Sequence, residues 1–271
     1  MKEWLVISDP APLKGSLNMA IDEFLFSSLG EEPQTFVRFY QWEKPTVSLG
    51  FSQDIRKAVD LDYCRSHGVD IVRRITGGKL VLHHKEVTYS ISSSDREFFT
   101  SSVANSYKSI SQGLMRGLEK MGLKPCLASS HPSSYAKGDS LCFSHPARDE
   151  IEIEGKKVIG SAQRRVGSRF IQHGSIPLVH DEALLKSVSL PGKEESQIRM
   201  TSLSQALGRN VSFEWAVDHF LAGFSEYFGV VLKPKTFAAS EREAIARIQK
   251  ARYENEDWTF LKKKNIQWEL L

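Results

Sequence analysis

Residues 150–176, EIEIEGKKVIGSAQRRVGSRFIQHGSI, contain three strand patterns in succession. Strands are expected over 150–154, 157–163 and 169–176, and the Glu154-Gly155-Lys156 step predicts a hairpin turn between the first two. Strands joined by such tight turns run antiparallel. This stretch therefore predicts the antiparallel part of a sheet, around which the rest of the chain is placed.

The flanking sequence adds further strand and helix patterns. Strands are expected at the N-terminus, around Cys142, and over 35–40, 46–50, 69–74, 79–82 and 87–91. The runs 35–40 and 46–50 are expected to pair with each other across the Pro45 turn. Apolar residues at helical spacing predict helices over 16–29, 60–67, 102–121, 181–187, 212–228 and 240–253. This order predicts an α+β fold, a mixed, largely antiparallel sheet flanked by helices, in one domain over residues 1–271.

Composition excludes several classes of protein. The chain has 271 residues, 41% hydrophobic and 25% charged, which is the balance of a globular protein rather than of a fibrous or disordered one. The 36 Lys and Arg against 33 Asp and Glu leave a net charge of +3, too small to indicate a nucleic-acid partner. Neither a signal peptide nor an apolar run long enough to span a membrane is found, so we expect a cytoplasmic protein with no membrane partner.

A basic segment with two adjacent glycines, RRITGGKLVLHH over residues 73–84, is the first candidate ligand site. Glycines let backbone N–H groups approach a ligand closely, and arginines bind a carboxylate or phosphate in a bidentate way. The alternative is a β-hairpin whose basic side chains are solvated. The spacing required for a Walker phosphate-binding loop is absent.

Cys142 and Lys157 are the candidates for nucleophilic and acid–base chemistry. Cys142 follows a polar loop, where a thiol can face a cleft, although an isolated cysteine is more often inert and buried. Lys157 precedes the small residues Gly160, Ser161 and Ala162, and the alternative for this lysine is a solvent-facing position on a strand. A second small and polar cluster contains His173 and Gly174. The histidines and acidic residues lack metal-ligand spacing, and the three cysteines lack the C-x-x-C pattern, so we expect no metal.

These motifs, taken in order, resemble the lipoate–protein ligase A and octanoyltransferase family of the biotin and lipoate attachment superfamily. The resemblance runs from about Trp4 to Phe260. It is carried by NMAIDE at 18–23, VRFY at 37–40, SLG at 48–50, RRITGG at 73–78 with His83, GKKVIGSAQ at 155–163 and QHGSI at 172–176. Each segment alone is weak, and their combination is specific.

The resemblance implies a mixed sheet with packed helices and a narrow tunnel for a medium-length acyl chain. Lys157 matches the active-site lysine of the family, and Cys142 stands in a Cys-Phe-x-x-Pro context like that of the cysteine-dependent octanoyltransferases. The implied acyl-binding residues come from the matched segments: Arg73, Arg74, Thr76, Gly77, Gly78, His83, Gly160, Ser161, Ala162, His173 and Gly174.

The activity that the resemblance implies is octanoyl transfer from acyl-carrier protein to a lysine of a lipoyl-domain protein such as glycine-cleavage H protein. No cofactor is expected for that reaction. Lys79 replaces the third glycine common in the family, which puts ATP use in doubt, and the accessory domain of ATP-dependent ligases is not expected after Phe260. Two alternatives stay open: an ATP- and Mg-dependent lipoate–protein ligase with a separate accessory subunit, and a non-catalytic relative that binds an acyl group or a carrier. A biotin ligase is disfavoured, since its Gly-Arg-Gly-Arg segment is missing.

Both expected protein partners are acidic, so we also expect a basic rim around the tunnel mouth. The residues assigned to this rim are Arg73, Arg74, Lys79, Arg164 and Arg165.

Overall fold

A computed structural model describes residues 1–9, 11–100, 102–128, 150–190 and 199–261. The strands are β1 Glu3–Ser8, β2 Thr35–Tyr40, β3 Thr46–Leu49, β4 Asp70–Arg73, β5 Val81–His83, β6 Glu86–Ser93, β7 Pro125–Leu127, β8 Ile151–Ile153, β9 Lys156–Val166, β10 Arg169–Pro177 and β11 Val231–Pro234. The α-helices are α1 Gly15–Ser27, α2 Ile55–Ala58, α3 Leu61–Ser66, α4 Val103–Lys120, α5 Glu182–Val188, α6 Leu203–Leu207, α7 Phe213–Phe228, α8 Ala239–Ile248 and α9 Glu256–Thr259.

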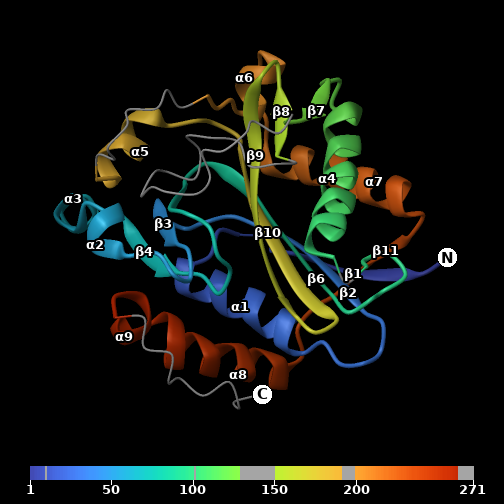
Figure 1. The fold of residues 1–271 in the computed structure, drawn as a ribbon, viewed down its shortest axis with the longest axis horizontal. Helices are drawn as coiled ribbons and strands as arrows, with labels where there is room; N and C mark the ends of the chain where they lie inside the picture. Colours follow the sequence, from blue (N-terminus) through green and yellow to red (C-terminus); the bar gives the residue numbers. More distant parts are fainter. Residues whose placement is uncertain (10, 101, 129–149, 191–198, 262–271) are drawn as a thin grey trace.

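An eight-stranded sheet in the order β11-β1-β2-β6-β10-β9-β8-β7 forms the body of the fold. Only the pairs of β1 with β11 and with β2 are parallel among its ladders, so the sheet is mixed and largely antiparallel, as predicted. Glu154 and Gly155 both have positive φ, 51° and 70°, which confirms the tight turn between β8 and β9. Helices lie on both faces of this sheet (Figure 1), which confirms the α+β class.

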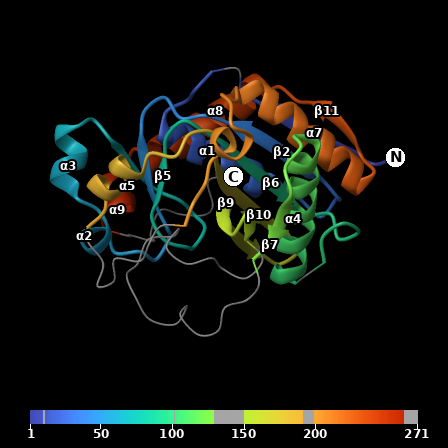
Figure 2. The same ribbon diagram turned by 90° about the horizontal axis from the view of Figure 1, so that it is seen from above.

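The two faces of the large sheet bury different side chains. One face packs against α4 and α7 through an apolar core that includes Phe39, Leu114 and Phe220. The other face lies under α1 and α8, with Ile171 in its core (Figures 1 and 2). Successive residues of a strand point to opposite faces of its sheet. Phe39 and the residues two positions away from it on β2 therefore face α7, while Arg38 and the residues two positions away from it face α1. The polar residues Arg38, Ser90 and His173 are thus buried on the α1 side.

A second, three-stranded sheet has the order β4-β3-β5. It corrects two expectations. The 35–40 and 46–50 runs do not pair with each other, because β2 joins β1 and β6 while β3 joins β4 and β5. Residues 73–84 do not form a β-hairpin either, because β4 is parallel to β3 and β5 is antiparallel to it, so the diglycine loop crosses over β3. Figure 2 shows α2, α3 and α5 gathered at this end of the molecule.

Helix boundaries agree closely with the sequence patterns, with two differences. The α1 helix begins at Gly15, so Ser16 lies inside the helix rather than capping it. A Cβ on Gly15 would lie 3.0 Å from Thr46 Cγ2. The expected helix over 240–253 is α8 followed by a π-helical turn, η2 Gln249–Tyr253. The strand expected around Cys142 lies outside the described residues. No helix in the described ranges is long and apolar enough to cross a membrane.

The α4–α7 packing rests on glycines and gives a stability prediction. A Cβ on Gly223 of α7 would lie 2.4 Å from Gly117 N and 2.8 Å from Gly113 O, both backbone atoms of α4. We expect Gly223→Ala to cost about 2–3 kcal/mol in the free energy of unfolding, because the helices must separate. Urea unfolding followed by circular dichroism measures this cost. Gly30→Ala is the control, since no atom lies within 4 Å of its Cβ position and its stability should be nearly unchanged.

Candidate active site

A cavity of about 430 Å³, its open mouth included, lies between the α1 face of the large sheet and the small sheet. Apolar and aromatic side chains form much of its wall, among them Met19, Trp42 and Val81. The polar residues around it come from β3, β5, β6, β9 and β10 and from the end of β4: Ser48, Arg74, His83, Thr88, Gly160, Ser161, His173, Gly174 and Ser175. Ala162 also borders it. Of the predicted acyl-binding residues, seven therefore meet at one cavity: Arg74, His83, Gly160, Ser161, Ala162, His173 and Gly174.

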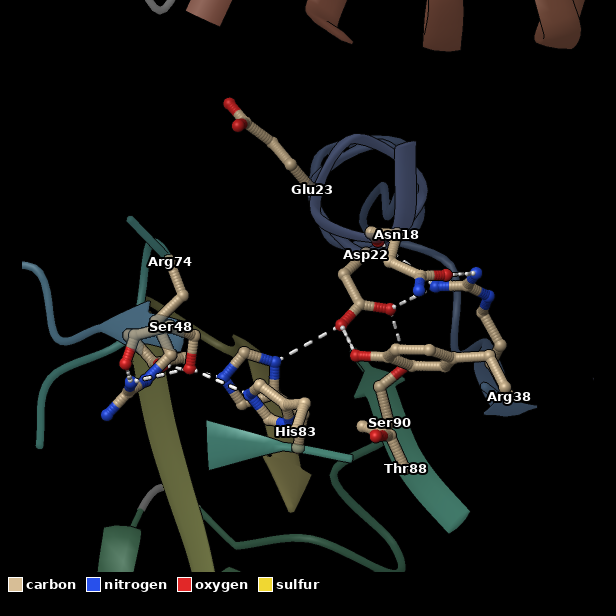
Figure 3. Close-up of polar contacts among 12 residues, drawn as sticks. Asn18, Asp22, Glu23, Arg38, Ser48, Arg74, His83, Thr88 and Ser90 are labelled. Atoms are coloured by element: carbon tan, nitrogen blue, oxygen red, sulfur yellow. Dashed lines mark hydrogen bonds and ion pairs between the residues drawn. The ribbon is translucent and has the colours of Figure 1, made fainter. Parts of the chain in front are cut away.

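Asp22, on α1, binds four partners beside this cavity (Figure 3). Its carboxylate accepts hydrogen bonds from Arg38 Nη1 at 2.9 Å, Tyr40 OH at 2.9 Å, Ser90 Oγ at 2.8 Å and His173 Nδ1 at 3.1 Å. Burial opposes its ionisation, but the hydrogen bond from His173 and the charge of Arg38 hold the pKa of Asp22 below its usual value. Asp22 is thus a buried carboxylate that orients His173.

His173 continues this contact to the diglycine loop. Because its Nδ1 donates to Asp22, its Nε2 accepts the hydrogen bond from the Thr76 hydroxyl, 2.7 Å away. Burial lowers the pKa of His173, so the imidazole is neutral at pH 7. Thr76 does not border the cavity, and the structure gives it the role of holding His173.

A second carboxylate orients the second cavity histidine. Glu86 Oε1 lies 2.7 Å from His83 Nδ1, and His83 Nε2 lies 2.8 Å from Ser48 Oγ. Thr88 and Ser175 also donate to the Glu86 carboxylate. The His83 ring stacks on Trp42 with centroids 4.0 Å apart and an interplanar angle of 15°. Two histidines thus border the cavity, and each is fixed by its own buried carboxylate.

Arg74 links this cavity to the diglycine loop. Its guanidinium donates to Ser48 O at 2.9 Å, to Ser48 Oγ at 3.0 Å, to Gly77 O at 2.9 Å and to Lys79 O at 2.7 Å. A Cβ on Gly50 would lie 1.9 Å from Gly78 O, so only glycine permits the loop to rest on the end of β3. Gly77 and Gly78 themselves are exposed, outside the cavity wall.

Arg73 has a different role from the one predicted. It is fully buried, and its guanidinium donates to backbone carbonyls of Gly50 at 2.9 Å, Gln53 at 2.8 Å and Thr259 at 2.8 Å. Trp258 Nε1 in turn donates to Arg73 O at 2.8 Å. Arg73 does not border the cavity but ties α9 to the loop after β3. Since Arg74 is also buried, neither arginine belongs to a basic rim, which corrects that expectation.

Arg164 and Arg165, which were both predicted in the basic rim, lie on opposite faces of the large sheet. Successive residues of β9 point to opposite faces of the sheet, so Arg164 lies over the Phe51 ring and donates to Ile75 O at 3.3 Å. Arg165 lies over Phe170 on the α4 side, where it donates to Ser106 Oγ at 2.6 Å. Only Arg164 is beside the diglycine loop, and the prediction that Arg165 joins it there is wrong.

Lys157 is buried, which excludes the solvent-facing alternative. Its Nζ lies 2.6 Å from Glu150 Oε1, and the two side chains are 2% and 3% exposed. Its backbone bonds the segment before α6, donating to Arg199 O and accepting from Thr201 N, each at 2.9 Å. Lys157 does not border the cavity just described. Cys142 lies outside the described residues, so its approach to Lys157 stays a prediction.

Several site residues have no sequence motif that singles them out. Asp22 was part of a matched segment but had no assigned role, and Ser48, Glu86 and Glu150 had none either. Only Glu86 has a signal of periodicity, since polar residues two apart on β6 share the face toward α1. In the described ranges, no group of three or more His, Cys, Asp or Glu is arranged to hold a metal ion.

The role of Asp22 gives a prediction with a pH dependence. Asp22→Asn removes one of the two carboxylates that compensate the buried Arg38 charge and leaves Asp9 as the other, and we expect it to cost about 3 kcal/mol at pH 7. The folded state lowers the pKa of Asp22, so its stabilisation is present above about pH 4 and is lost as the pH falls through the folded pKa. The difference in unfolding free energy between wild type and variant should therefore shrink below pH 4. Asp62→Asn, on an exposed i,i+3 pair, should change nothing at either pH.

Comparisons with known proteins agree with this geometry. The Octanoyltransferase LipM proteins of Geobacillus kaustophilus and Kyrpidia tusciae are 36% and 38% identical to the chain, with 90% and 92% of it and 94% and 96% of those proteins covered. A lipoate-protein ligase A structure bound with ATP superposes with a TM-score of 0.81 at 20% identity, covering 96% of this chain and 99% of that one. A candidate lipoate protein ligase from T. acidophilum with bound lipoic acid gives 0.78 at 22%, covering 96% and 100%.

The family comparison covers all the elements that build the cavity. The model described as the lipoyl protein ligase A/B catalytic domain matches residues 14–225, from the start of α1 into α7. Together with relatives above 30% identity over nearly the full length, this match places the chain in the lipoyl protein ligase A/B catalytic-domain family.

Proposed function

We propose that the protein is an octanoyltransferase that moves an octanoyl group from acyl-carrier protein to a lysine of a lipoyl-domain protein such as glycine-cleavage H protein. The relatives named octanoyltransferases support acyl transfer. The observation that carries the proposal is the cavity, since a largely apolar wall that includes the neutral His173 imidazole suits a medium-length acyl chain. The transfer needs no cofactor.

Cys142 is proposed as the nucleophile and Lys157 as its acid–base partner. The Cys142 thiolate attacks the thioester carbonyl of the donor, the donor C–S bond breaks, and the departing thiolate takes a proton from the Lys157 ammonium. The amine of the acceptor lysine then attacks the enzyme thioester and gives its proton to Lys157 as the amide forms. Cys142 leaves as thiolate, so both groups return to their starting states.

Glu150 supports this role of Lys157. A buried ammonium requires a compensating charge, and the Glu150 carboxylate 2.6 Å from Lys157 Nζ supplies it. Lys157 is the second residue of β9, and Glu150 directly precedes β8. The hairpin formed by β8 and β9 therefore holds the two side chains beside each other.

The rival enzyme is an ATP-dependent lipoate ligase. The ligase structures bound with ATP or lipoic acid share the fold with this chain at 20% and 22% sequence identity. A similarity at that level indicates a common fold and does not indicate a common activity. A ligase would form an acyl-adenylate and would not need Cys142. A non-catalytic relative would bind the acyl group or the carrier without turnover.

The proposed covalent intermediate can be detected directly. Mixing the protein with octanoyl-acyl-carrier protein in the absence of ATP should add one octanoyl group, detected by intact mass and removed by hydroxylamine. Cys142→Ala should lack the adduct, because no thiolate attacks the donor. Lys157→Met should form it far more slowly, by roughly 100-fold or more, because the leaving thiolate loses its acid.

Two results would contradict the transferase. One is octanoyl transfer retained in Cys142→Ala. The other is lipoyl-domain modification that appears only with ATP and free lipoate, which would favour the ligase. Cys126→Ser is the matched control, since this exposed thiol has no proposed role and its loss should leave the adduct unchanged.

Docking of the carrier protein can be tested at Arg164. Arg164 lies half-buried beside the exposed diglycine loop, where an acidic carrier can approach the cavity mouth, whereas Arg165 is on the opposite face of the sheet. Arg164→Glu should therefore raise KM for the carrier substrate about tenfold and steepen its dependence on salt. Arg165→Glu is the control that adds the same charge on the α4 side. Equal effects of the two variants would refute a docking surface at the diglycine loop.

A further inference from the structure

Ser48, His83 and Glu86 have the contacts of a serine–histidine–carboxylate triad. Ser48 Oγ lies 2.8 Å from His83 Nε2, and His83 Nδ1 lies 2.7 Å from Glu86 Oε1. The carboxylate is buried, accepts further hydrogen bonds from Thr88 and Ser175, and is placed as an acceptor for the Nδ1 proton. His83 is consequently oriented with the Nε2 lone pair on the Ser48 hydroxyl, which is the tautomer that a general base requires.

The surroundings of Ser48 also suit acyl chemistry. Ser48 and His83 both border the cavity that has an apolar wall, and Trp42 stacks on the imidazole to restrict its rotation. Arg74 Nη1 donates to Ser48 Oγ at 3.0 Å, so a positive charge faces the oxygen that must lose its proton, which favours that loss. In Figure 3 the side chains of Arg74, Ser48 and His83 converge on the same point.

The other histidine relay of the site differs in the property that matters. Thr76, His173 and Asp22 have the same chemical order, with contacts of 2.7 and 3.1 Å, but Thr76 does not border the cavity. The Thr76 hydroxyl therefore has no access to a substrate in the cavity, which identifies that relay as structural support. Among the described residues, a hydroxyl that combines the triad contacts with access to the cavity occurs at Ser48.

We propose that Ser48, His83 and Glu86 form a second nucleophilic site that passes medium-chain acyl groups from esters or thioesters to water, independently of Cys142. Ser48 Oγ bonds to the acyl carbonyl carbon, its proton passes to His83 Nε2, and the leaving alcohol or thiol departs with that proton as its bond to the carbonyl breaks. A water molecule then attacks the Ser48 ester and gives a proton to His83. The proton returns to Ser48 Oγ as the carboxylic acid leaves.

The experiment uses a full-length background without the two thiols that would compete. In Cys126→Ser/Cys142→Ala protein, hydrolysis of p-nitrophenyl octanoate should persist, and adding Ser48→Ala should lower kcat/KM by about 100-fold or more. An alkyl fluorophosphonate probe should label Ser48 in the same background, as located by peptide mass spectrometry. The labelling does not depend on whether the Ser48→Ala protein folds.

Ser189→Ala is the matched control. This buried serine donates to Leu185 O at 2.6 Å and does not border the cavity, and its loss should leave hydrolysis and labelling unchanged. His83→Gln should lower hydrolysis as Ser48→Ala does. Hydrolysis that survives Ser48→Ala, or a probe adduct on any residue other than Ser48, would overturn the proposal. Since Cys142 is absent throughout, failure of the cysteine mechanism leaves this test intact.

Discussion

The buried carboxylate of Asp22 is the constraint on which the rest of the site depends. An ionised carboxylate inside a protein costs several kcal/mol unless it is fully hydrogen-bonded. Asp22 meets that requirement with donors from three strands: Arg38 and Tyr40 of β2, Ser90 of β6 and His173 of β10. These contacts fix α1 on the large sheet, and Met19 of the same helix borders the cavity.

The adjacent arginines at the end of β4 extend this constraint in two directions. Strand alternation sends Arg73 toward α9 and Arg74 toward the cavity. Arg73 gathers backbone carbonyls from residues 50–53 and 258–259, while Arg74 gathers those of the diglycine loop and of Ser48. Each guanidinium replaces several missing backbone donors, which permits irregular loops to be buried. The shape of the loop beside the cavity thus depends on contacts made as far away as residue 259.

The sequence predicted what local patterns control. The hairpins over 150–176, the long helix α4 and the gathering of His83, Gly160 and His173 at one cavity follow from turn chemistry, periodicity and family motifs. Local patterns did not predict the pairing partner of β2. The strand β6, some 50 residues later, competes with the nearby β3 for this pairing, and only the buried polar network on β6 favours β6. The burial of Arg73 was missed for a similar reason, since its acceptors are backbone carbonyls, which leave no mark on composition.

The Asp22 and Glu86 carboxylates lie one layer behind the cavity wall, whereas Arg74 borders the cavity with its guanidinium held by backbone carbonyls. Asp22 and Glu86 each lie behind an imidazole, and Glu150 lies against Lys157, so three buried carboxylates each face a histidine or a lysine. Each carboxylate holds one ring nitrogen of its histidine, so the other nitrogen faces a hydroxyl, that of Thr76 for His173 and that of Ser48 for His83. In the proposed octanoyl transfer, an apolar acyl chain would lose favourable free energy beside an exposed carboxylate, and the two imidazoles stand between these carboxylates and the cavity. The groups that would repel such a chain are therefore the groups that orient the histidines.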